Sequence, residues 1–144
     1  MTSIYKINKI NNKKLKEYKQ KAMRELNNFY NRKWVYGTPQ IFVVDDRKTI
    51  DALWERETEN WIVGWSWGTH TIFILNPKNI TQESCHDGNT YNIYKLIKHE
   101  LSHSFFATQF GESNHTWINE GLSIYTADQF DMFKMPKEFS GFLD

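Results

Sequence analysis

The chain has 144 residues, of which 40% are hydrophobic, 16% aromatic and 24% charged, and its formal net charge is +1. This length matches one domain with a modest core, and the hydrophobic content excludes a disordered chain. No run of eighteen apolar residues occurs, and the first residues lack the apolar core of a signal peptide, so we expect a single-domain cytoplasmic protein with no membrane partner. The single cysteine, Cys85, excludes an internal disulfide and a cysteine-only metal cluster.

A basic amphipathic helix is predicted near the N-terminus. Apolar side chains recur there at three- and four-residue spacing, which indicates one buried face: Leu15, Tyr18, Ala22, Leu26 and Phe29. Residues 1–33 contain ten lysines and arginines but only Glu17 and Glu25, so the rest of the chain carries a net charge of −7. We interpret the lysines as the solvated face of this helix, and we expect no nucleic-acid partner.

The middle of the chain predicts a small sheet. The segment "PQIFVVDD" (39–46) has the β-branched run of a strand, and residues 48–57 have the pattern of a short helix. Residues 60–77 predict a β-hairpin that turns near Gly68. The polar, glycine-containing stretch 78–90 predicts a loop before the next helix.

That next helix carries two histidines on the face that it buries. Helical spacing places five side chains on one stripe: Leu96, His99, His103, Phe106 and Phe110. Gly111 supplies a C-terminal stop. Two imidazoles four residues apart lie about 6 Å apart along the helix axis and about 40° apart around it, close enough to bind one metal ion. Glu100 is offset around the helix, where it flanks such an ion in the way that a general base does.

A third protein ligand is needed, because a catalytic zinc site has three protein ligands and one open position. Sixteen residues separate His103 from Glu120, enough to end one helix, turn and begin another with Thr116 as its N-cap. An antiparallel return of the chain would bring Glu120 toward the histidines.

Other interpretations of these residues remain open. His115 is an alternative third ligand, as in a SprT-like arrangement, and Cys85 with His86 is a weaker candidate metal pair. The two helical histidines also fit a site without metal, in which both are ordinary buried, hydrogen-bonded side chains.

The motif "HELSH" (99–103) followed by "WINEGLSIY" (117–125) resembles the gluzincin metallopeptidases, which carry HExxH on one helix and a ligating glutamate in an "NEG"-like motif on the next. The short chain is similar to the minimal forms called minigluzincins. The resemblance implies an α+β fold with an N-terminal helix, a small mixed sheet and two metal-bearing helices. It also implies a Zn²⁺ cofactor held by His99, His103 and Glu120, Glu100 as the general base of peptide-bond hydrolysis, and a peptide or protein substrate.

Two supporting residues of that family lack an obvious counterpart. Gluzincins usually place a tyrosine or histidine beyond the ligating glutamate to donate a hydrogen bond to the oxyanion, but this chain has neither after Tyr125, which points away from the ion. His70 and His115 are the upstream candidates. An acidic residue one turn after the ligating glutamate often supports a histidine, but Ile124 stands there and Asp128 follows a turn later. The alternative function is therefore an inactive zincin-like binding module with a structural zinc.

The hairpin and the tail also have roles that the resemblance suggests. The strand 69–75 is either a sheet edge that pairs with an extended substrate or an internal strand packed on both faces. The tryptophans 61, 65 and 67 are interpreted as core or as the wall of a cleft, because the hairpin has no lysine or arginine for a phosphate backbone. The aromatic tail 128–144 is expected either to complete the core or to lie in the cleft and keep a zymogen latent.

Overall fold

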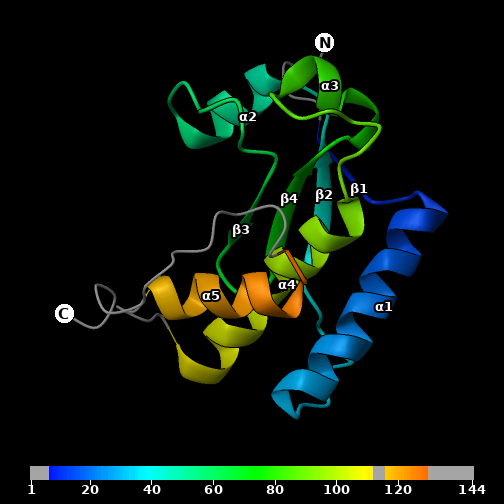
Figure 1. Cartoon of the computed structure of the whole chain (residues 1–144), viewed down its shortest axis with the longest axis vertical. Helices are drawn as coiled ribbons and strands as arrows, with labels where there is room; N and C mark the ends of the chain where they lie inside the picture. The colour runs from blue at the N-terminus through cyan, green and yellow to red at the C-terminus, as the bar shows by residue number, and fades with distance from the viewer. Residues whose placement is uncertain (1–6, 112–115, 130–144) are drawn as a thin grey trace.

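The computed structural model describes residues 7–111 and 116–129 (Figure 1). Over these residues the protein has the predicted α+β fold, in which helices pack on a small mixed sheet. The elements in chain order are β1 (Ile7–Lys9), α1 (Lys13–Tyr30), β2 (Gln40–Val44), α2 (Arg47–Trp54), β3 (Gly64–Trp67), β4 (Thr71–Leu75), the 3₁₀ turn η1 (Pro77–Asn79), α3 (Ile80–Glu83), α4 (Ile93–Phe110) and α5 (Thr116–Thr126). No helix in this described part is long and apolar enough to cross a lipid bilayer.

The N-terminal helix α1 is present and packs against α4. Its first turn is capped by Asn12, whose side chain accepts hydrogen bonds from two backbone N–H groups of that turn. The prediction that Phe29 belongs to the buried face was wrong, because Phe29 is 45% exposed whereas Tyr30 is 7% exposed. Tyr30 takes the inner position because its ring stacks on Phe105 at 5.5 Å and its hydroxyl shares a 2.8 Å hydrogen bond with Ser102.

The sheet has the strand order β1-β2-β4-β3. The predicted hairpin is formed by β3 and β4, which pair antiparallel through a turn where Gly68 has a φ of 66°. Strand β4 pairs with β2 in parallel on its other side, so of the two alternatives for residues 69–75 the internal strand packed on both faces is found and the sheet edge is not. The outer strand next to β4 is β3. The opposite end is β1, which the sequence did not predict because it is three residues long with one apolar side chain, Ile7.

The stretch 78–90 was predicted to be a loop, but it contains the end of η1 and the short helix α3. Pro77 occupies the first turn of η1, and the Asn76 side chain accepts a 3.1 Å hydrogen bond from the Lys78 N–H. Ile80 is fully buried and anchors α3 to the core. The cap and the proline start η1, and α3 follows it directly with its first residue, Ile80, in the core.

Helix α4 lies against both α1 and the sheet, and α5 crosses it (Figure 1). Its buried face carries Leu96, Ile97, Leu101 and Phe105 within the main hydrophobic core. The predicted stripe of α4 is correct except at its end, where Phe110 is 59% exposed because the helix extends beyond the sheet before it ends at Gly111. The histidines therefore sit in the middle of a helix that is fixed on several sides.

Candidate metal centre

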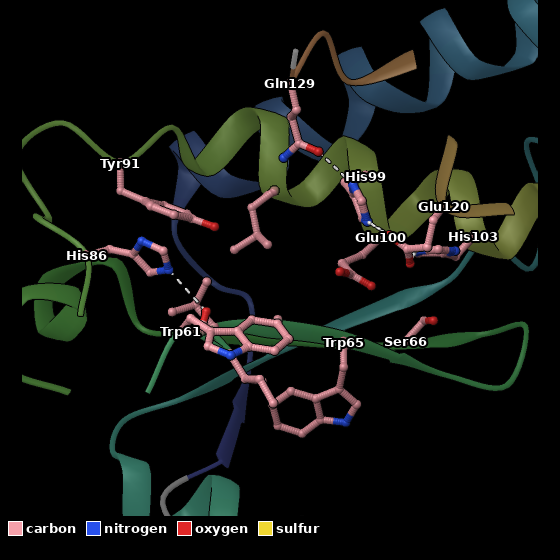
Figure 2. Close-up of a pocket in the computed structure, with 14 residues that line it drawn as sticks. Trp61, Trp65, Ser66, His86, Tyr91, His99, Glu100, His103, Glu120 and Gln129 are labelled. Atoms are coloured by element: carbon pink, nitrogen blue, oxygen red, sulfur yellow. Dashed lines mark hydrogen bonds and ion pairs between the residues drawn. The ribbon is translucent and has the colours of Figure 1, made fainter. Parts of the chain in front are cut away.

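The side chains of His99, His103 and Glu120 converge on one point between α4 and α5 (Figure 2). The Nε2 atoms of the two histidines are 3.1 Å apart. One carboxylate oxygen of Glu120 lies 2.9 Å from Nε2 of His103, and the other lies 3.5 Å from Nε2 of His99. Helix α5 begins at Thr116, where the sequence predicted its N-terminus, and its return along α4 brings Glu120 to the histidines.

The distances between these donor atoms are close to the edge length of a zinc coordination tetrahedron. Zinc binds imidazole nitrogen and carboxylate oxygen at about 2.0–2.2 Å, and a tetrahedral angle then separates two donor atoms by about 3.3–3.5 Å. The three observed separations of 2.9, 3.1 and 3.5 Å lie around this value. Two histidines and one glutamate also form a ligand set that zinc uses in catalytic sites, with a fourth position left open. The residues therefore fit a zinc ion.

Each histidine is oriented by an amide side chain behind it. Nδ1 of His99 donates to the Gln129 amide oxygen at 2.6 Å, and Nδ1 of His103 donates to the Asn119 amide oxygen at 2.8 Å. An amide oxygen can only accept, so each neutral imidazole carries its proton on Nδ1 and its lone pair on Nε2. Both lone pairs then face the Glu120 carboxylate, an arrangement that requires a proton or a metal cation between them.

The pKa shifts of these groups also indicate that the site stabilises a positive charge. Burial lowers the pKa of His103, but its hydrogen bond to Glu120 and the charges of Glu100 and Glu120 outweigh burial, so that the net shift is upward. The hydrogen bonds from His103 and His99 hold the pKa of Glu120 far below its usual range. The site thus favours a deprotonated carboxylate beside a cation.

Gln129 reaches His99 because the chain turns sharply after α5. Asp128 adopts a left-handed conformation with a φ of 52°, and the Gln129 N–H donates to the Ile124 carbonyl oxygen at 3.1 Å. This turn places Gln129 in the interior, where it is 3% exposed, and leaves Asp128 exposed. His99 is therefore supported by neither Ile124 nor Asp128, the two positions that the resemblance to gluzincins suggested.

Glu100 lies beside these donor atoms on α4 and is also buried. Burial is the main reason that its pKa is raised, the Glu120 charge adds to this, and the two histidines oppose it. A raised pKa favours a carboxyl group that can both take and release a proton. Glu100 also lines the cavity next to these side chains.

The site opens into a cleft of about 690 Å³ between α4 and β3. Trp61 and Trp65 form the wall opposite α4 (Figure 2), as predicted for a cleft, whereas Trp67 lies outside it and is largely exposed. The remaining lining combines the metal-centre residues with apolar side chains and a few polar groups: Ile62, Val63, Gly64, Ser66, His86, Tyr91 and Leu96.

Several other candidates from the sequence lie elsewhere. His70 packs on Trp34 in a separate surface depression, so it cannot serve the cleft. Cys85 is exposed and belongs to no group of metal donors in the described part of the chain. Tyr125 is 60% exposed and contacts Phe29 rather than the metal centre. His115 and most of the tail 128–144 lie outside the described residues.

Comparisons with known proteins assign the chain to no family. No protein-family model matches the chain, and neither a curated protein nor a solved structure matches it at a significant level. A function is therefore argued from the geometry of the site.

Proposed function

We propose that this protein is a zinc-dependent peptidase of the gluzincin type. The observation that carries the proposal is the convergence of two imidazole lone pairs and one carboxylate on a single point beside the buried Glu100. His99, His103 and Glu120 would hold a zinc ion, which would polarise a peptide carbonyl as a Lewis acid and lower the pKa of water to about 7. The surrounding residues account for the rest of the chemistry.

Glu100 acts as the general base in this proposal. Its carboxylate takes a proton from the attacking water and then delivers that proton to the nitrogen of the leaving amine, which breaks the peptide bond. Gln129 and Asn119 keep the two histidines in the tautomer that leaves Nε2 unprotonated. Neither histidine then takes up the proton, so the proton remains on Glu100 until the amine receives it.

Strand β3 offers a surface on which an extended substrate can align. The Leu75 N–H donates to the Val63 carbonyl oxygen at 2.8 Å, and this pair continues the register in which Gly64 lies opposite Ile74. Hydrogen-bonded and non-hydrogen-bonded pairs alternate in an antiparallel ladder, so the backbone groups of Gly64 and Ser66 point away from β4. Both residues line the cleft, and we assign substrate pairing to β3 in place of residues 69–75.

A second candidate function is a zinc-binding module without catalytic activity. It is favoured by the positions of His70 and Tyr125, since neither of these donors lies at the cleft. The two functions predict the same metal stoichiometry and differ only in hydrolysis.

The test combines metal analysis with a peptide-library cleavage assay on the zinc-loaded protein. We expect one Zn²⁺ per chain, weaker binding after Glu120→Ala, and loss of binding when His99→Ala and His103→Ala are combined. Glu100→Gln should keep the zinc and abolish hydrolysis, because it removes proton transfer without removing a ligand. Glu17→Gln, the same change at an exposed position on α1, is the matched control.

Three outcomes would change the assignment. Stoichiometric zinc in the double histidine variant would show that the site is wrong. Zinc without cleavage in the wild-type protein would support the binding module. Equal cleavage by the wild type and Glu100→Gln would point to another base or to a contaminating protease.

A further inference from the structure

One end of the cleft is built from aromatic side chains that the proposed chemistry does not use. The rings of His86 and Tyr91 are in tilted contact, with centroids 4.7 Å apart and planes at 49°, and Nε2–H of His86 donates to the Trp61 carbonyl oxygen at 3.1 Å. Figure 2 shows these three residues on the side of the cleft away from His103. Trp61 is 60% exposed at the rim, whereas the Tyr91 ring lies deeper.

This aromatic wall is held in place by hydrogen bonds from outside the cleft. The Arg47 guanidinium donates to the backbone carbonyl oxygens of Asn60 at 3.2 Å and of Glu83 at 2.8 Å. The Cys85 N–H donates to the same Asn60 carbonyl oxygen at 3.1 Å. The segment that carries Trp61 is thereby tied to the segment that carries His86, so the wall is preformed.

The Tyr91 hydroxyl is the polar group at this end of the cleft. It is directed toward the middle of the cleft and toward Glu100 (Figure 2). Within residues 7–111 and 116–129 it makes no hydrogen bond. Burial raises the pKa of this phenol, and the Glu100 charge adds to the effect, so the hydroxyl keeps its proton at neutral pH. Leu96 and Val63 supply apolar surface beside it.

We propose that this end of the cleft is a subsite for a tyrosine side chain of the substrate, next to the bond that is cleaved. The inference rests on the proposed function. Trp61 and the His86–Tyr91 pair supply aromatic surface, which favours an aromatic ring over an aliphatic side chain. A phenylalanine ring would bury the Tyr91 hydroxyl without a partner, whereas a tyrosine hydroxyl can pair with it. A carboxylate side chain would be repelled by Glu100 and Glu120.

The test compares peptides that differ only in having Tyr, Phe or Leu beside the cleaved bond. For the wild-type protein we expect kcat/KM to be about five- to tenfold higher for the tyrosine peptide than for the phenylalanine peptide, the effect of one hydrogen bond between neutral groups. Tyr91→Phe should bring the two peptides within about twofold of each other, because the tyrosine peptide loses its partner and the phenylalanine peptide no longer buries an unpaired hydroxyl. Tyr36→Phe, at a position that is 89% exposed, is the matched control.

The result separates the subsite from the peptidase activity. Cleavage without a tyrosine preference, or a preference that survives Tyr91→Phe, would overturn the subsite while the proposed function stands. If no peptide is cleaved, NMR titration of Glu100→Gln protein with blocked tyrosine and phenylalanine tripeptides replaces the assay. A tyrosine preference in binding that Tyr91→Phe removes would then support the subsite although the activity had failed, and equal binding would overturn it.

Discussion

Replacing Gln129 by alanine removes the acceptor behind His99 without touching a metal ligand. In the metal-free variant, His99 can move its proton from Nδ1 to Nε2. Zinc binding forces the proton back to Nδ1, which lies in a nearly closed environment and no longer has the amide oxygen that accepted at 2.6 Å. An unsatisfied buried N–H costs about 1–3 kcal/mol, so we expect the zinc Kd to rise by about 5- to 150-fold.

A competition titration against a colorimetric zinc chelator would measure this change. Gln109→Ala makes the same substitution at an exposed position on α4 and should leave the Kd unchanged. Gln129→Glu keeps an acceptor for Nδ1 and should bind zinc at least as tightly as the wild type. If Gln129→Ala and Gln109→Ala bind zinc equally well while both remain folded by circular dichroism, the proposed role of Gln129 is refuted.

Three further predictions concern packing, pH and the sheet edge. Tyr30→Phe removes the buried hydrogen bond to Ser102 and should cost about 1 kcal/mol of stability, seen as a Tm lower by about 3 °C. The Lys98 ammonium, followed by a tyrosine hydroxyl, lowers the pKa of Glu25, so the stability that this carboxylate contributes is present above its unfolded pKa of about 4.3 and lost as pH falls through the lower folded value. Urea titrations should therefore show Glu25→Gln to be destabilising at pH 7 and to approach the wild type near pH 3. Ser66→Pro removes an N–H that points away from β4, so it should leave the fold intact and lower kcat/KM by about tenfold.

Each of these predictions has an outcome that contradicts it. An unchanged Tm for Tyr30→Phe would mean that Ser102 is satisfied by Thr126 alone, whose hydroxyl also donates to it at 3.1 Å. A stability difference between Glu25→Gln and the wild type that stays constant down to pH 3 would exclude the ion pair as its cause. Cleavage by Ser66→Pro at the wild-type rate would exclude substrate pairing at β3. Lys9→Pro on the opposite outer strand, where the N–H likewise points away from the neighbouring strand, is the control for a general effect of proline on the sheet.

Much of the candidate site could be predicted from short-range spacing. Two histidines four residues apart on a helix must share a face, and the length of the following segment allows Glu120 to return to them. Asn119 could have been found by the same reasoning, since it adjoins Glu120 and faces α4. Gln129 could not have been predicted, because its position depends on a left-handed turn at Asp128. Helical periodicity does not predict this turn, and no glycine marks it.

The sequence alone determined the helices other than α3, the hairpin and the shared face of His99 and His103, because these depend on periods and spacings within a few turns of chain. Only the tertiary structure decided which strand is outermost, since β4 pairs with β2 across a long connection and thereby leaves β3 facing the cleft. It also decided that Tyr30 rather than Phe29 enters the core and that His70 lies far from the cleft. Such choices depend on which partner a side chain meets from a distant segment, and local periodicity carries no information about that partner.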